Sequence, residues 1–111
     1  MEKFVHKLST ARGQEHSRIW LERERLTRAG FTKGKTFRKT WAGGALTLTL
    51  AKPGKDDAAR DFGTVAGTDD RPVIDIVGEK VREYFGSKAT HISVTYEEGS
   101  ITVRVASAFK Q

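Results

Sequence analysis

The sequence predicts a mostly β protein with two short helices, in which two copies of one strand-helix-hairpin unit share a single core. The chain repeats itself at an offset of 55 residues, which aligns residues 18–51 with residues 73–106 without a gap. Apolar and polar residues alternate along several short segments, as they do in half-buried strands. A length of 111 residues is enough for one modest core but too short for two independent ones.

The repeat rests on identical residues and on matching chemistry around them. Identical pairs include Ile19/Ile74, Glu24/Glu79, Thr40/Thr95, Gly44/Gly99, Thr47/Thr102 and Ala51/Ala106. Hydrophobic positions keep their phase between the pairs, with Trp41 matched by Tyr96 and Leu48 by Val103. A chain with two copies is best interpreted as an intramolecular version of a homodimer, so we expect a monomeric pseudo-dimer that forms one domain over residues 1–111.

The first unit, residues 16–51, carries the pattern of a strand, a short helix and a hairpin. The expected elements are a strand at 16–21, a helix at 22–29, and hairpin strands at 35–41 and 45–51. Gly30 is expected to end the helix, because glycine accepts the left-handed conformation common at helix ends. Leu46 and Leu48 share the inner face of the last strand, while Thr47 and Thr49 share its outer face.

The second unit, residues 72–106, follows the same plan. The expected elements are a strand at 72–76, a helix at 78–85, and hairpin strands at 90–96 and 100–105. Residues 52–71 are rich in Pro, Gly and Asp and are expected to be a linker, with Phe62 and Val65 as candidate anchors on the surface. Two alternatives stay open for the N-terminal stretch, an edge strand around Phe4 and Val5 or a loose arm.

Charge is divided unevenly between the two halves. Residues 1–55 hold thirteen Lys and Arg against four acidic residues, while residues 56–111 hold seven against ten. Within the repeats, residues 18–51 carry a net charge of +6 and residues 73–106 a net charge of −1. If the copies fold alike, one pseudo-symmetric face is basic and its counterpart is not. This asymmetry predicts an anionic partner for the first repeat.

Composition and motifs exclude several other classes of function. No apolar run approaches the roughly 20 residues that span a bilayer, and no secretory signal or cysteine is present, so we expect a soluble, cytoplasmic protein without a membrane partner. The histidines His6, His16 and His91 lack the spacing of metal ligands, so no metal or cofactor is expected. The segment Gly34-Lys35-Thr36 fails as a phosphate loop because it leads into a strand. No catalytic pair is visible, and the chain is therefore interpreted as a binding protein rather than an enzyme.

One motif resembles a known superfamily. The motif begins with the apolar residues Ile19, Leu21 and Leu26. It continues with Ala29-Gly30-Phe31 and Gly34, and it ends in a hydrophobic hairpin from Phe37 to Leu48. This pattern resembles the SpoVT/AbrB-like swapped-hairpin superfamily and is most similar to SymE-like toxin proteins. In it the first glycine caps the hinge helix, the phenylalanine fills the core, and the second glycine turns the chain into the next strand. The second copy keeps the hairpin but has Phe85-Gly86 where the first has Gly30-Phe31.

The resemblance implies a pseudo-two-fold swapped-hairpin β-barrel and a nucleic-acid partner. In DNA-binding members, basic residues on the first strand, the hinge helix and the following loop contact phosphates. At those positions this chain has Arg18, Arg23, Arg25, Arg28, Lys33, Lys35, Arg38 and Lys39. The second copy carries Asp75, Glu79 and Glu83 on the corresponding surface, which argues against symmetric reading of a palindrome.

Three hypotheses for function follow. The first is a small nucleic-acid-binding regulatory protein, with DNA favoured over RNA. The second is a protein-interaction module, such as an antitoxin, a phage or mobile-element inhibitor, or an accessory subunit of a nucleic-acid enzyme. The third is a SymE-like nuclease toxin. Trp41, close to the basic cluster, could stack on a base, but Tyr96 at the matching position favours a packing role.

Overall fold

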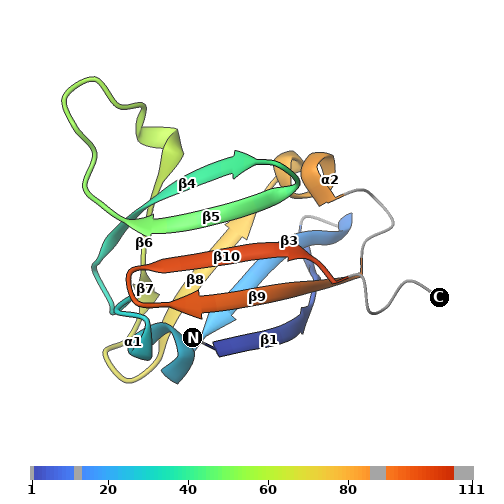
Figure 1. Ribbon diagram of the computed structural model, residues 1–111, viewed down its shortest axis with the longest axis horizontal. Coiled ribbons are helices and arrows are strands. Elements are labelled where there is room, and N and C mark those ends of the chain that lie inside the picture. The colour runs from blue at the N-terminus through green and yellow to red at the C-terminus, as the bar shows by residue number, and fades with distance from the viewer. Residues whose placement is uncertain (1, 12–13, 86–89, 107–111) are drawn as a thin grey trace.

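Two antiparallel sheets lie one behind the other, with a short helix at either end (Figure 1). The computed structural model describes residues 2–11, 14–85 and 90–106. The larger sheet has the strand order β1-β9-β10-β5-β4-β6, and the smaller has the order β2-β3-β8-β7. The expected class, mostly β with two short helices, is confirmed.

The first half of the chain contains β1 (Glu2–Lys7), β2 (Ser9–Ala11), β3 (Gln14–Glu22), α1 (Glu24–Arg28), β4 (Thr36–Ala42) and β5 (Ala45–Leu50). The second half contains a 3-10 turn (Ala59–Asp61), β6 (Phe62–Thr64), β7 (Ala66–Gly67), β8 (Pro72–Val77), α2 (Glu79–Phe85), β9 (His91–Glu97) and β10 (Ser100–Val105). Each unit thus has the expected order of strand, helix and hairpin. Of the two alternatives for the N-terminal stretch, the edge strand is present as β1, which pairs with β9.

The two units meet at equivalent positions in both sheets. Where β5 pairs with β10, Thr47 lies opposite Thr102, and where β3 pairs with β8, Trp20 lies opposite Asp75. The members of each pair are separated by the same 55 residues that relate the repeats in the sequence. A pseudo-two-fold axis therefore passes through both sheets at these two points.

The predicted linker contains strands that have counterparts at the N-terminus. Strand β6 pairs with β4 in the way that β1 pairs with β9. The backbone N–H of Leu8 donates to Thr90 O at 2.8 Å, and that of Val65 donates to Lys35 O at 2.9 Å. Because Lys35 and Thr90 are equivalent, Leu8 and Val65 are equivalent too, at an offset of 57. Each unit therefore begins one strand earlier than the sequence alone indicated, and the connection between the units shortens to residues 52–58.

The core is built by the inner faces of both sheets and by the helices. Phe31, which follows the hinge helix, is completely buried, as are Leu26, Leu46 and Leu48. Val65 from the predicted linker is buried as well, at 1% exposure, so it anchors this segment in the core. None of the helices in the described part of the chain is long and apolar enough to cross a membrane.

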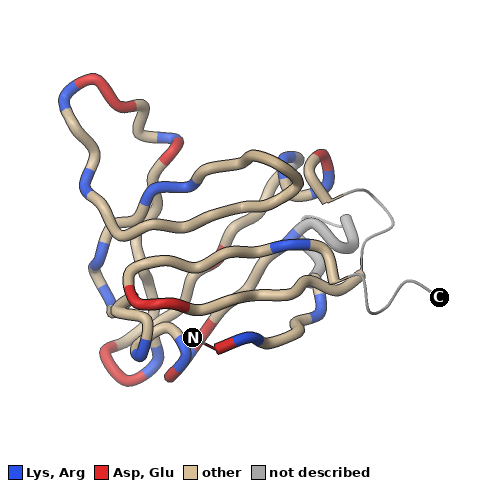
Figure 2. The backbone as a smooth tube through the Cα atoms, viewed as in Figure 1, with Lys and Arg blue, Asp and Glu red and all other residues tan. Residues whose placement is uncertain are grey.

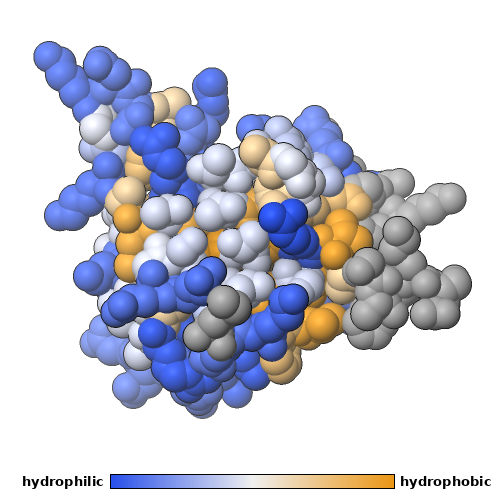
Figure 3. Space-filling view, viewed as in Figure 1, coloured by the Kyte–Doolittle hydropathy of each residue, from blue (hydrophilic) through white to orange (hydrophobic). Residues whose placement is uncertain are grey.

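The outer face of the larger sheet is polar, and both helices lie at the ends of the sheets rather than over it (Figure 1). Four threonines face one another across four neighbouring strands, namely Thr40, Thr47, Thr102 and Thr95. Figure 3 shows a weakly polar centre on this face, with strongly hydrophilic side chains at the upper left and along the bottom and hydrophobic side chains at the right. Alternation with buried leucine, isoleucine and valine explains the arrangement, because successive side chains of a strand point to opposite faces.

Candidate nucleic-acid interface

The structure distributes the eight predicted basic residues over several elements (Figure 2). Three lie at or in α1, two lie in the loop after it, two lie in β4 and one lies in β3. In β4, Arg38 points to the outer face of the sheet, whereas Lys39 shares the inner side with Phe37 and Trp41. The eight residues therefore do not form one continuous surface.

Three of these eight basic residues pair closely with carboxylates from elsewhere in the chain, and Arg23 also lies 3.9 Å from its neighbour Glu22. Arg18 donates two hydrogen bonds to Asp75 at 2.8 and 2.7 Å, and Arg28 donates two to Glu2 at 2.6 and 2.9 Å. Arg38 forms an ion pair with Asp57 at 3.1 Å. The hydrogen bonds from Arg28 hold the pKa of Glu2 below its usual value, so this carboxylate stays charged. Binding of phosphate by these three guanidinium groups would have to compete with an internal partner.

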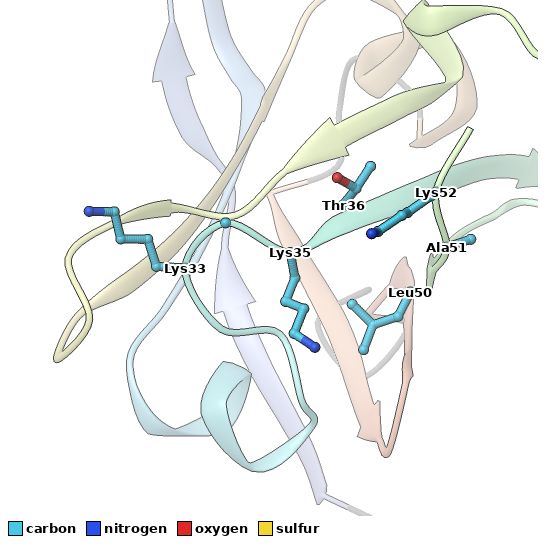
Figure 4. Close-up of a pocket in the computed structure, with 7 residues that line it drawn as sticks. Lys33, Lys35, Thr36, Leu50, Ala51 and Lys52 are labelled. Carbon is cyan, nitrogen blue, oxygen red and sulfur yellow. The ribbon is translucent and has the colours of Figure 1, made fainter. Parts of the chain in front are cut away.

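The lysines of the loop line an open cavity of about 520 Å³ between that loop and the end of β5. Figure 4 shows Lys35 and Lys52 bordering the cavity, while Lys33 extends away from it. Lys52 does not belong to the predicted set. The backbone hydrogen bond from Ala51 N–H to Thr36 O, 3.1 Å long, brings it beside the loop. No acidic residue lines this cavity among the residues described.

A second concave site, a groove of about 410 Å³, lies between β1, β3 and the start of α1. We call it the aromatic groove, and its lining consists of Phe4, His6, Lys7, Trp20, Glu22, Arg23 and Arg25. Phe4 is 40% exposed and Trp20 is 38% exposed. The guanidinium of Arg25 lies 3.7 Å from the centre of the Phe4 ring, and that of Arg18 lies 5.0 Å from the Trp20 ring. The site thus combines cations with exposed aromatic rings.

Sequence reasoning found the arginines of this groove but missed its aromatic residues. Phe4 and Trp20 belong to strands of different sheets, and only the fold places them on one groove. A signal was present for Trp20, since it alternates with the buried Ile19 and Leu21 and must therefore face outward.

The backbone at the edge of the groove is strained. Arg23, immediately before α1, has φ 71° and ψ −148°, a region that is nearly exclusive to glycine. The equivalent residue in the second unit is Gly78, which also has a positive φ, of 130°. The junction between strand and helix thus has a positive φ in both units, and only the first unit has a side chain there.

At the groove, the half-buried His6 and the buried Tyr96 form a polar pair. His6 Nε2 lies 3.0 Å from the Tyr96 hydroxyl. Burial raises the pKa of Tyr96 to about 12. Burial, assisted by the positive charge of Arg25, lowers the pKa of His6. The neutral forms of both groups are therefore favoured, and the cationic character of the groove comes from its Lys and Arg residues.

Trp41 has a packing role. Its ring centre lies 5.0 Å from that of Tyr84 and 6.1 Å from that of Phe85, both in α2. Its counterpart Tyr96 is buried at 3% exposure. The structure thus agrees with the packing interpretation of this tryptophan rather than with base stacking.

The pseudo-two-fold axis relates the aromatic groove to a groove of different chemistry. The second groove contains Asp61, Val77, Gly78, Lys80 and Glu83 together with Lys39, Trp41, Arg60 and Ile76. Asp61, which precedes β6, occupies the position equivalent to Phe4, and Asp75 occupies that of Trp20. Carboxylates therefore stand where the first unit has exposed rings.

Among the residues described, no group of three His, Cys, Asp or Glu could hold a metal ion. Comparisons with models of protein families, with curated proteins and with solved structures found no match to this chain. The resemblance to the SpoVT/AbrB-like superfamily, and the swapped-hairpin barrel it implies, therefore stay predictions.

Proposed function

We propose that this chain is a small nucleic-acid-binding regulatory protein of the cytoplasm that contacts the phosphate backbone through its first repeat. The observation that carries the proposal is the difference between equivalent positions of two similar units. The first unit has Arg23, Arg25 and Arg28 at and in its helix. The second unit has Gly78, Lys80 and Glu83 at the same three positions, in that order. A general need for solubility would load both units alike, whereas a polyanionic ligand needs only one basic surface.

The cations best suited to phosphate are those of the cavity beside β5. The side chains of Lys35 and Lys52 border it, with no acidic residue among the described lining to offset their charge. Arg25 adds a cation at the aromatic groove. Binding through such residues releases counterions from the nucleic acid, so the affinity falls with increasing salt.

The proposal is tested by titrating the protein with duplex DNA and with single-stranded RNA at two salt concentrations. Replacement of Lys35 or Lys52 by Gln should weaken binding to all sequences alike and lower the salt slope by about 1 for each phosphate that the variant no longer neutralises. Lys80→Gln is the matched control for Arg25→Gln, because the two positions are equivalent. We expect the Lys80 variant to have the smaller effect.

Other outcomes would favour the other hypotheses. Equal losses from Arg25→Gln and Lys80→Gln would contradict the asymmetric interface. Absence of binding to either nucleic acid at low salt, where attraction is strongest, would exclude the proposal and favour a protein-interaction module. Cleavage of the oligonucleotides during the titration would favour a SymE-like nuclease.

A further inference from the structure

Two rings of the aromatic groove remain exposed to solvent. Phe4 and Trp20 keep 40% and 38% of their surface exposed, while Phe31 and Phe37 at the hinge keep 0% and 2%. Exposed large rings that share a groove with cations are typical of surfaces on which bases stack.

The second unit provides an internal control for this groove. If exposed rings were a requirement of the fold, the equivalent groove would carry them too. At the positions equivalent to Phe4 and Trp20 the second unit has Asp61, which lines its groove, and Asp75. The ring that lines the second groove, Trp41, packs against Tyr84 and Phe85 of α2. The rings are therefore not needed to form the strands or the pairing across the axis, and this favours a role for them in ligand binding.

The charge of the groove suits a phosphate-linked ligand. Lys7, Arg23 and Arg25 line it, and the only carboxylate among its described lining residues is that of Glu22. This carboxylate lies 3.9 Å from the Arg23 guanidinium, so the two charges partly offset each other. Lys7 and Arg25 remain to attract phosphates of a ligand in the groove.

From these features we infer that the aromatic groove binds unpaired nucleobases of a single-stranded nucleic acid, with Trp20 and Phe4 as stacking surfaces. The inference rests on the proposed nucleic-acid-binding function and adds the class of ligand. Bases within a duplex already stack on one another and do not present their faces, whereas unpaired bases do. Arg25 lies over one face of Phe4, so that a base can stack on its guanidinium plane or on the neighbouring indole.

The experiment is a titration with oligo(dT), oligo(U) and a DNA duplex, carried out on the full chain. The chain has two tryptophans, so Trp41→Phe leaves Trp20 as the only indole reporter. We expect the fluorescence of Trp20 to be quenched by both single strands. We also expect Trp20→Ala to weaken binding of single strands roughly 5- to 150-fold, the range typical for one stacked base. Trp20→Phe, which keeps a ring, should weaken it much less.

Salt dependence separates this inference from the proposed function. A stacked ring carries no charge, so Trp20→Ala should leave the salt slope unchanged, whereas Lys35→Gln should reduce it. Binding of the duplex should be similar in the Trp20 variants and the parent. Circular dichroism of each variant checks that the fold is retained. A second variant, Phe4→Leu, removes the other ring of the groove but keeps an apolar side chain at that position.

Two results would overturn the inference. If the parent binds oligo(dT) and oligo(U), but Trp20→Ala and Phe4→Leu bind them equally well, the groove is not a stacking site while the proposed function stands. If Trp20→Phe loses as much affinity as Trp20→Ala in folded protein, a ring is not what the ligand recognises. Failure of the parent to bind any of the three probes would remove the proposed function together with this inference.

Discussion

At the scale of single residues, Arg23 shows how one backbone position separates the two units. The junction between strand and helix demands a positive φ, which glycine adopts freely and other residues adopt at a cost of about 1–3 kcal/mol. Gly78 meets this demand in the second unit, and Arg23 meets it in the first. A side chain retained at such a cost at the edge of a groove points to a role in ligand binding rather than in folding.

We therefore expect Arg23→Gly to increase the free energy of unfolding by about 1 kcal/mol, since relief of strain exceeds the entropy that glycine adds to the unfolded chain. The same variant should weaken binding of nucleic acid. Chemical denaturation measures the first effect, and titration with DNA and RNA measures the second. Gly78→Ala is the matched control and should destabilise the protein, because it introduces a side chain at φ 130°. A loss of stability in Arg23→Gly would show that the arginine side chain contributes to the fold.

At the scale of elements, sequence patterns located the longer strands but not the shortest ones. Strands β4, β5, β9 and β10 each have six or seven residues, enough for alternation to be visible. Strands β6 and β7 have three and two residues, within a segment whose Pro, Gly and Asp content is typical of a linker. Strand β6 pairs with β4, far earlier in the chain, so no local pattern could have revealed it. Strand β7 forms a hairpin with the adjacent β8 across residues 68–71, but its two residues are too few for alternation to be visible.

The packing of β6 against the core predicts that a substitution in this strand destabilises the protein, which would not be expected if the segment were a free linker. At Gly63 an added Cβ atom would lie 2.6 Å from Cζ of Phe37. Phe37 is buried at 2% exposure and packs near Phe31, so its ring has little room to move. Gly63→Ala should therefore reduce the free energy of unfolding by about 1–3 kcal/mol. The exposed neighbour Thr64 serves as control, and Thr64→Ala should cost less than about 1 kcal/mol. Equal, small effects in urea denaturation would mean that this segment does not pack on the core.

At the scale of the whole molecule, charge could be predicted from the sequence, but its pairing could not. The basic character of the first repeat is evident from the order of residues, and the candidate set follows from it. The partners Glu2, Asp57 and Asp75 lie far away along the chain or in the other unit, and only the folded structure brings them to Arg28, Arg38 and Arg18. The aromatic groove arises in the same way, from strands of two sheets. Long-range contacts therefore determine which of the predicted cations are available to a ligand.

The pseudo-two-fold arrangement predicts how the chain behaves when it is divided. Each unit contributes strands to both sheets, with β5 against β10 and β3 against β8, and the buried cluster draws on both units. The connection between them, residues 52–58 after β5, extends away from the body of the molecule (Figure 1). Fragments 1–54 and 55–111 should therefore associate into a folded one-to-one complex.

Neither fragment alone has a partner for its open sheet edges, so neither should show a cooperative unfolding transition. The excess of positive charge on the first fragment also opposes its association with a second copy of itself. Light scattering with circular dichroism of the fragments, separately and mixed, measures this. The intact chain should be a folded monomer under the same conditions, because its partner unit is built in. A cooperative thermal transition in either isolated fragment as a monomer would mean that the two units do not depend on a shared core.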